Sequence, residues 1–150
     1  MRKNKTILFF KANGPYGFLS NFYQAPIIID DLEWPTVEHY YQAQKTTITE
    51  NREQIRLSKS PDEAKSLGRK FHNRTDWEEK KVEIMKFALE IKFNQQPELK
   101  QKLIDTNNAV LHEDSPNDFI WGWRNNGLDY LGKLLMEIRA KLFNISEQDL

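Results

Sequence analysis

The spacing of apolar residues predicts two amphipathic helices in the second half of the chain. Val82, Met85, Leu89 and Phe93 recur every three or four positions, which places them on one face of a helix. We expect this helix over about 77–94, and its broad apolar face favours a place in the core. A second helix is predicted by apolar residues at positions 131, 134, 135, 138 and 142.

Helix start signals predict shorter helices between these two long ones and the first third of the chain. Ser60 is followed by Pro61 at the first helical position and by Glu63 three residues after the cap. This helix is expected to end near Leu67, with Gly68 close to that end. Thr75–Glu78 is a second capping box, and further short helices are expected at 50–58 and from Pro97 to Ile104.

Extended structure is predicted mainly near the N-terminus. Residues 6–11 are β-branched and aromatic, and residues 26–34 have the pattern of a hairpin with its turn at Asp30 and Asp31. A short extended run is expected at 109–111. The predicted fold class is therefore α+β and predominantly helical, with a small N-terminal β element.

Length and charge restrict the class of protein further. The 150 residues suit a single domain over 1–150, with its core at about 6–143. Basic and acidic residues number 22 each, so no overall basic field is available to hold nucleic acid. The sequence has no cysteine, and its three histidines lack metal-ligand spacing, so the sequence offers no metal site of these ligands. No membrane span or signal peptide is recognised, so we expect a cytoplasmic protein.

Residues 34–45 form the segment around which the chain is organised. They predict a helix capped by Thr36. At about 100° per residue, one narrow face of this helix carries four polar or aromatic side chains. These are Glu38, Tyr41, Gln42 and Lys45. The simplest interpretation is a solvated stripe of spaced charges. Four aromatic residues crowd the same stretch, however, which favours burial, and buried polar groups are paired or functional.

Other segments also carry side chains suited to a ligand site. An irregular stretch at 114–127, together with Glu113 just before it, holds Asp118, Trp121 and Gly122. Elsewhere lie Ser20 and Asn21 on a turn, Arg69 near a helix end and Trp77 at a helix start. The simpler interpretations are core positions for the tryptophans, a turn cap for Asp118 and a helix-end charge for Arg69. The sequence contains no phosphate loop, dinucleotide fingerprint or nucleophile elbow.

Taken together, these segments resemble the YbiA-like (NADAR) N-glycosidase family. The resemblance covers roughly Phe9 to Leu142, in the order and spacing of the family pattern. The matching stretches are Phe18–Tyr23, Trp34–Lys45, Ala64, Leu67–Arg69, Asp76–Trp77, Met85, Lys92–Phe93, Leu103, Thr106, Leu111–Glu113, Asp118, Trp121–Gly122 and Leu131–Arg139. One departure is Asp129, where the family pattern has asparagine, and a ligand contact at this position would change substrate preference.

The resemblance implies cleavage of an N-glycosidic bond. In the riboflavin branch of the family, the substrates are phosphorylated intermediates with a ribosylamine on a pyrimidinone. Related branches act on ADP-ribose attached to guanine. We favour the riboflavin type because the chain is compact and has no net charge, whereas a nucleic-acid substrate favours a basic face. The alternatives are ADP-ribosyl-guanine hydrolysis, a non-catalytic module that binds nucleotides or ADP-ribose, and a purely structural domain with an exposed Glu38 face.

Together with the chemistry of glycoside cleavage, the resemblance also suggests site residues. Glu38 is the expected carboxylate that stabilises an oxocarbenium-like centre, with Asp118 as a second candidate. Lys45 is expected to act as a Schiff-base nucleophile or to contact the phosphate or leaving group. The expected substrate contacts are Ser20, Asn21, Tyr41, Gln42, Arg69, Trp77, Trp121, Gly122 and Asp129. The expected partner is a small phosphorylated N-riboside, with nucleic acid only in the ADP-ribose alternative and no membrane. No metal or organic cofactor is expected, because hydrolysis needs only water and placed charges.

Overall fold

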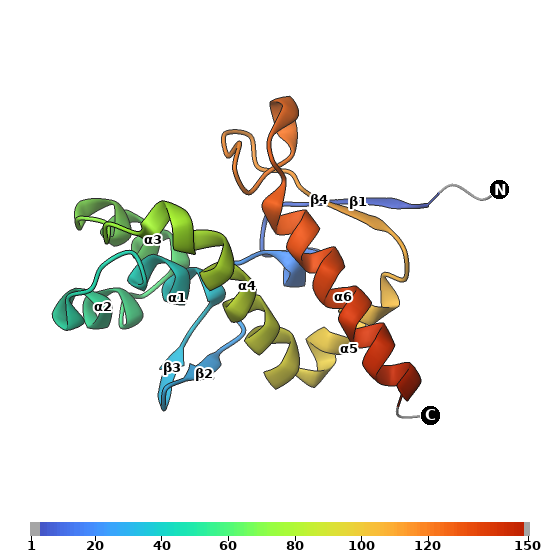
Figure 1. Cartoon of the computed structure of the whole chain (residues 1–150), viewed down its shortest axis with the longest axis horizontal. Coiled ribbons are helices and arrows are strands. Elements are labelled where there is room, and N and C mark those ends of the chain that lie inside the picture. The colour runs from blue at the N-terminus through green and yellow to red at the C-terminus, as the bar shows by residue number, and fades with distance from the viewer. Residues whose placement is uncertain (1–3, 149–150) are drawn as a thin grey trace. The chain divides into compact units, whose positions relative to one another are not determined.

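The structure, a computed structural model, describes residues 4–148 and divides into two compact units (Figure 1). The first unit joins the chain up to Ser20 to the segment from Gln96 onward, and the second unit is Asn21–Gln95. Helix accounts for 52% of the chain and strand for 10%, which confirms the predicted α+β, predominantly helical class. The single domain expected over 1–150 stays a prediction.

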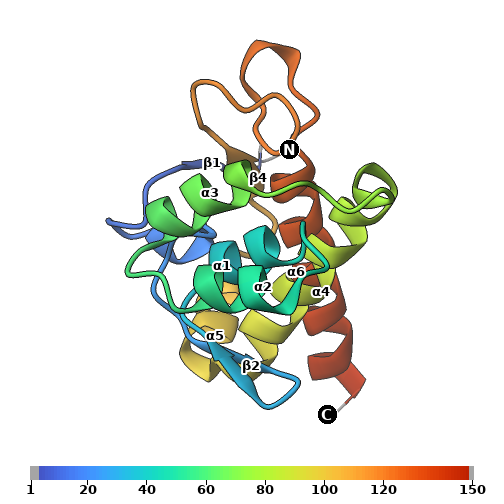
Figure 2. The ribbon, with the colours of Figure 1, turned by 90° about the vertical axis from the view of Figure 1, so that its left-hand side faces the viewer.

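The second unit consists of four helices and one hairpin (Figure 2). Its helices are α1 (Val37–Ala43), α2 (Thr49–Arg56), α3 (Pro61–Lys70) and α4 (Trp77–Gln95). Helix α1 contacts the other three. The predicted hairpin is confirmed as β2 (Ile27–Ile29) and β3 (Leu32–Trp34), which pair antiparallel. Asp30 and Asp31 both have positive φ, 55° and 62°, as the tight two-residue hairpin turn requires.

The predicted cap of α1 is confirmed, but the helix is shorter than predicted. The Thr36 side chain accepts a hydrogen bond from the His39 backbone N–H at 3.1 Å. The helix ends at Ala43, and the backbone N–H of Lys45 donates to the Gln42 carbonyl at 3.2 Å in a tightened last turn. Lys45 therefore lies beyond the helix, and a regular helical spacing from Glu38 does not apply to it.

Helix α3 is longer than predicted. Its start is confirmed, because the Ser60 side chain accepts from the Glu63 N–H at 3.1 Å. It continues through Gly68 and ends at Lys70 instead of near Leu67. A Cβ on Gly68 would meet the side chain of Gln42, so this glycine allows a close approach between α3 and α1 and does not end the helix.

The predicted buried face of α4 is confirmed, and one charged residue of the same helix, Lys92, is buried as well. Met85, Leu89 and Phe93 are fully buried, as predicted. Phe87, in contrast, is 45% exposed and lies beside Tyr40. Lys92 is 1% exposed, and its ammonium lies 5.3 and 5.7 Å from the ring centres of Phe93 and Tyr23.

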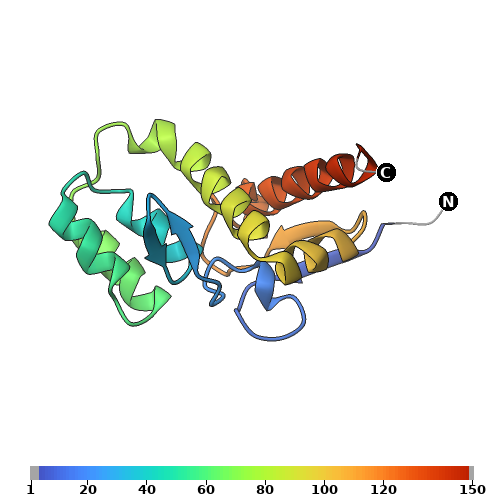
Figure 3. The same ribbon diagram turned by 90° about the horizontal axis from the view of Figure 1, so that it is seen from below.

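The first unit is built on a parallel pair of strands (Figure 3). Strand β1 (Thr6–Phe9) pairs with β4 (Val110–Glu113), with Phe9 opposite Glu113. The other elements are the 3₁₀ turns η1 (Gly17–Leu19) and η2 (Arg124–Asn126) and the helices α5 (Pro97–Asp105) and α6 (Tyr130–Gln148). Helix α6 contacts both β4 and α5. The expected N-terminal β element is thus divided, because β1 finds its partner in the last third of the chain and parallel pairing needs a long connection.

Helix α6 begins at Tyr130, one residue before the predicted start. The predicted apolar positions are buried: Leu131, Leu134, Leu135, Ile138 and Leu142. Between residues 4 and 148, no helix has the length and apolar character needed to span a membrane.

Candidate functional site

The carboxylate of Glu38 is buried and held by a neighbour on the same helix. Glu38 is 6% exposed in the first turn of α1, and Gln42, one turn later, is 3% exposed. Gln42 Nε2 donates to Glu38 Oε1 at 2.7 Å. The interpretation of this face as a solvated stripe is therefore wrong, and so is the exposed Glu38 that a purely structural domain requires.

Gln42 is itself placed by the close approach of α3. A Cβ added to Gly68 would lie 3.0 Å from Cδ and 3.2 Å from Cβ of Gln42, so no larger residue fits without displacing the amide. Within residues 4–148, Gln42 Oε1 is buried and has no hydrogen-bond partner. The Gln42 amide therefore donates its N–H to Glu38, while its oxygen has no partner among the residues described. A buried acceptor without a partner destabilises the fold, so this arrangement calls for a functional explanation.

Lys45 lies in a partly buried and strongly cationic environment. Its ammonium is 5.7 Å from the ring centre of Tyr41. Burial lowers the pKa of Lys45, and the positive charges of Arg69, Lys65 and Lys81 lower it further, while Glu38 acts in the opposite direction. A lysine with a lowered pKa is more readily available as a neutral nucleophile, and a group of cations favours a phosphorylated ligand.

The aromatic and amide residues of this cluster are also largely buried. Trp77 is 4% exposed, and its ring centre lies 5.1 Å from that of Tyr41. Asn21 is 8% exposed, and its Nδ2 donates to the Met85 sulfur at 3.4 Å. The Asn21 backbone carbonyl accepts from the Glu38 N–H at 3.2 Å, which ties the turn to the helix. We call Asn21, Glu38, Tyr41, Gln42, Lys45, Arg69 and Trp77 the Glu38 cluster; all seven belong to the second unit.

The remaining predicted residues belong to the first unit: Ser20, Asp118, Trp121, Gly122 and Asp129. Asp118 Oδ1 accepts from the backbone N–H groups of Ile120 and Trp121 at 3.1 and 2.9 Å, so this carboxylate does cap its own turn. The half-buried ring of Trp121 lies 6.2 Å from that of Tyr130. Ser20 is 5% exposed, and its backbone N–H donates to the Gly17 carbonyl at 3.0 Å.

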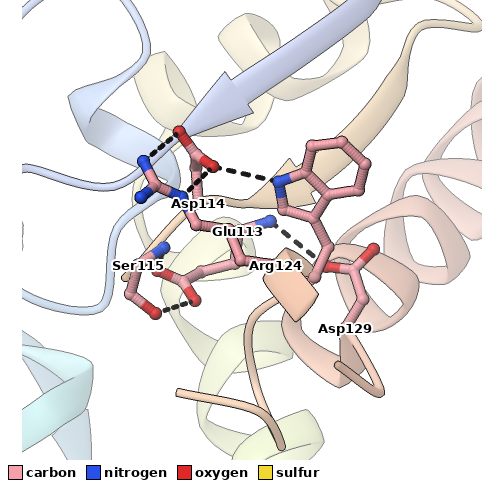
Figure 4. Close-up of polar contacts among 6 residues, drawn as sticks. Glu113, Asp114, Ser115, Arg124 and Asp129 are labelled. Carbon is pink, nitrogen blue, oxygen red and sulfur yellow. Dashed lines mark hydrogen bonds and ion pairs between the residues drawn. The ribbon is translucent and has the colours of Figure 1, made fainter. Parts of the chain in front are cut away.

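Glu113, which the sequence offered as a ligand-site candidate without a specific role, lies beside Ser115 and Asp114 (Figure 4). It is 7% exposed, and its carboxyl accepts from Ser115 Oγ at 2.7 Å and from the Ser115 N–H at 3.0 Å. Burial raises the pKa of Glu113 to about 7, and the charges of Asp118 and Asp129 act in the same direction. A carboxyl that titrates near neutral pH is suited to general acid catalysis. The sequence placed Glu113 just before the irregular stretch, but its burial depends on packing.

Packing around Glu113 also accounts for Gly122. A Cβ at this glycine would lie 2.7 Å from Glu113 Oε2 and 2.5 Å from the Asp118 carbonyl. Just beyond Glu113, Asp114 Oδ1 accepts from Trp123 Nε1 at 3.0 Å and pairs with Arg124 Nε at 2.8 Å (Figure 4). These contacts close the 113–124 loop on itself.

Asp129 has both carboxylate oxygens engaged inside the first unit. Oδ2 lies 2.6 Å from His112 Nδ1, and Oδ1 accepts from the Glu113 backbone N–H at 3.2 Å. The His112 ring stacks on Trp123 at 4.5 Å. The aspartate that departs from the expected asparagine therefore supplies two acceptors at once. Among the residues described, no group of three or more His, Asp or Glu side chains is placed to hold a metal ion.

The chain matches one family model and several proteins of known name. A family model described as NADAR domain matches residues 8–143, in both compact units. A protein named N-glycosidase from Nostoc punctiforme is 41% identical over 147 residues, which cover 93% of this chain and 94% of that protein. N-glycosidase YbiA of Escherichia coli is 42% identical over 140 residues, covering 91% and 88%.

A solved structure and a longer plant relative extend the comparison. The NMR structure of E. coli YbiA superposes with a TM-score of 0.88 and 38% identity, and it covers 100% of this chain and 91% of that one. The maize protein named riboflavin biosynthesis protein PYRR, chloroplastic, is 39% identical over 155 residues. These cover 91% of this chain, which spans only 25% of the maize protein.

Proposed function

Because this chain belongs to the NADAR domain family, we propose that it is an N-glycosidase acting on phosphorylated ribosylaminopyrimidine intermediates of riboflavin biosynthesis. The products are ribose 5-phosphate and the free base. The observation that carries the proposal is near-complete coverage of two relatives whose names state N-glycosidase activity. The name of the maize relative supports the riboflavin branch.

The reaction requires charge stabilisation at the sugar carbon. When the C1′–N bond breaks, the electron pair leaves with the nitrogen and C1′ becomes oxocarbenium-like. We assign Glu38 to the stabilisation of this centre, because its carboxylate is buried and held in one orientation by Gln42. Water then adds to C1′ and releases a proton, and Asp118 is the second carboxylate that we assign to this step.

Departure of the base is easier when its nitrogen is protonated, so a proton donor is needed. Glu113 suits this role because burial raises its pKa to about 7, which keeps a large fraction of its carboxyl protonated near neutral pH. Ser115 holds the carboxyl in place through two hydrogen bonds. The base thus carries away one proton from Glu113 and the attacking water gives one proton to Asp118, so proton exchange with solvent restores both carboxyl groups.

Lys45 has two proposed roles that make different predictions. As a nucleophile, its neutral amine attacks C1′, the base leaves, the sugar ring opens as an imine, and water hydrolyses the imine. As a binding group, its ammonium contacts the substrate phosphate. The lowered pKa of Lys45 supports the first role, and the neighbouring cations Arg69 and Lys65 support the second. Arg69, Ser20, Asn21, Tyr41, Trp77, Trp121, Gly122 and Asp129 remain the proposed substrate contacts.

The test is direct measurement of product release from two substrates. The protein is incubated with the ribosylaminopyrimidinone 5′-phosphate and, separately, with ADP-ribosylated guanosine. We expect ribose 5-phosphate from the first, with loss of activity in Glu38→Gln and Lys45→Ala. Release of ADP-ribose from the second substrate alone assigns the protein to the ADP-ribosyl-guanine branch. Binding of either substrate without release identifies a non-catalytic module and refutes the proposal.

Matched variants and trapping complete the experiment. Glu33→Gln and Lys70→Ala make the same chemical changes at exposed positions of the second unit and are expected to keep full activity. Borohydride added during turnover reduces an imine, so a covalent adduct found only when Lys45 is present identifies the nucleophile. A cytoplasmic location is a further prediction, which cell fractionation tests.

A further inference from the structure

A cavity of about 430 Å³ lies entirely within the first unit. Its lining residues come from β1 and the residue before it, from η1 and the loop before it, and from the end of α5 with the turn that follows. Figure 3 shows the ribbon of these elements. Its volume falls in the range of small-molecule sites. None of its lining residues belongs to the Glu38 cluster or to the 113–129 segment, so the proposed reaction leaves this cavity without a role.

The floor of the cavity is apolar and aromatic. Ile7, Phe18 and Ala109 are at most 3% exposed, and the half-buried ring of Tyr16 forms part of the wall. Such a surface favours a flat or apolar group, because burying the group removes apolar area from water and aromatic rings stack on it. The floor therefore suits the planar part of a ligand.

The rim of the cavity is cationic. Lys5 Nζ donates to the Tyr16 hydroxyl at 2.9 Å, and Lys102 Nζ lies 5.8 Å from the ring centre of Phe18. Among residues 4–148, neither ammonium forms an ion pair with a carboxylate. Asp105, also on the rim, accepts a hydrogen bond from Gln101 on the same helix. Two lysines against one aspartate leave a net positive rim.

We propose that this cavity binds a small organic anion, with a phosphate or carboxylate group at Lys5 and Lys102 and a planar ring on the Tyr16 and Phe18 side. Ammonium groups recognise such anions as point charges, and the amide of Asn107 at the rim adds hydrogen-bonding capacity for a ring substituent. The site goes beyond the proposed glycosidase activity and does not depend on it.

The experiment is a titration of ¹⁵N-labelled protein with pyridoxine 5′-phosphate, followed by amide chemical shifts. This probe has a planar ring and a phosphate but no glycosidic bond, so it is not a substrate of the proposed reaction. We expect saturable shifts at the amides of Ile7, Phe18 and Ala109. Pyridoxine, which lacks the phosphate, is expected to bind at least about tenfold more weakly. Equal binding of the two probes, or shifts confined to other residues, overturns the proposal.

Variants separate this site from the catalytic one. The double change Lys5→Gln and Lys102→Gln is expected to weaken binding by about tenfold or more, since both charges are lost. Lys100→Gln changes the same helix outside the cavity, and Lys45→Ala changes the Glu38 cluster; both are expected to bind the probe as the unaltered protein does. The amide spectrum reports directly whether each variant is folded. A double variant that binds normally refutes the role of the lysines.

Discussion

Gln42 donates its side-chain amide to the carboxylate of Glu38 across one turn of α1, at 2.7 Å, and both side chains are buried. The hydrogen bond favours the charged form of the acid and restricts its orientation. Gln42 therefore positions Glu38, a more specific role than the substrate contact expected from the sequence. This relationship leads to predictions that do not require knowledge of the natural substrate.

Replacement of Gln42 tests this positioning role. Gln42→Leu keeps a similar volume but removes the donor, so Glu38 loses both its fixed orientation and a bond that stabilises its charge. We expect kcat to fall by about 10- to 100-fold, with a smaller change in KM. Gln54→Leu, exposed on α2, is the control. Equal kcat in Gln42→Leu and Gln54→Leu contradicts the positioning role.

Gly68→Ala has the opposite effect from that expected in an ordinary helix. In an exposed helix interior, replacing glycine by alanine stabilises by about 1 kcal/mol. At Gly68 the new Cβ meets the side chain of Gln42, so we expect destabilisation by about 1–3 kcal/mol together with reduced activity. Urea denaturation measures the first effect. Ser66→Ala, exposed on the same helix, serves as the comparison and is expected to be neutral or slightly stabilising.

The charge of Glu38 is expected to control the titration of Lys45. Burial lowers the pKa of Lys45, and Glu38 partly offsets this by raising it. Glu38→Gln removes the offsetting charge, so the pKa of Lys45 should fall further. Reductive ¹³C-methylation and NMR measure this pKa, with Lys45→Arg used to assign the signal. The coupling is absent if the Lys45 signal titrates identically in Glu38→Gln and in the exposed control Glu33→Gln.

Glu113 is expected to make stability depend on pH. Its folded-state pKa of about 7 lies above the ordinary value of 4.5, so between these values the folded protein binds more protons than the unfolded chain. The free energy of unfolding therefore decreases as pH rises through this window, by up to about 3 kcal/mol. Glu113→Gln is neutral throughout and should lose this dependence.

Urea denaturation at about pH 5 and about pH 8 measures this effect. In the unaltered protein, the free energy of unfolding should be lower at about pH 8 than at about pH 5. In Glu113→Gln this decrease should be smaller. Glu98→Gln, an exposed change on α5, controls for the general loss of one negative charge. Equal pH dependence in Glu113→Gln and the unaltered protein would show that the buried carboxyl does not titrate as described.

Local features of the chain were accessible before the structure was known. The caps at Thr36 and Ser60, the buried face of α4 and the turn at Asp30 and Asp31 all follow from neighbours within a few residues. The resemblance to the NADAR family also follows from residues in order along the chain, and the family model confirms it. The roles assigned to individual site residues stay predictions.

The amino-acid sequence by itself determined where the helices lie, the caps at Thr36 and Ser60, the hairpin and the family, because short-range hydrogen bonds and the periodic burial of apolar side chains are encoded locally. Only the tertiary structure decided that Gly68 makes room for Gln42, that β1 pairs with β4, and that Asp129 accepts from both His112 and Glu113. The raised pKa of Glu113 is likewise decided by the tertiary structure, because it results from burial. Desolvation and close approach arise from atoms distant in sequence, and no local pattern specifies which of them will meet.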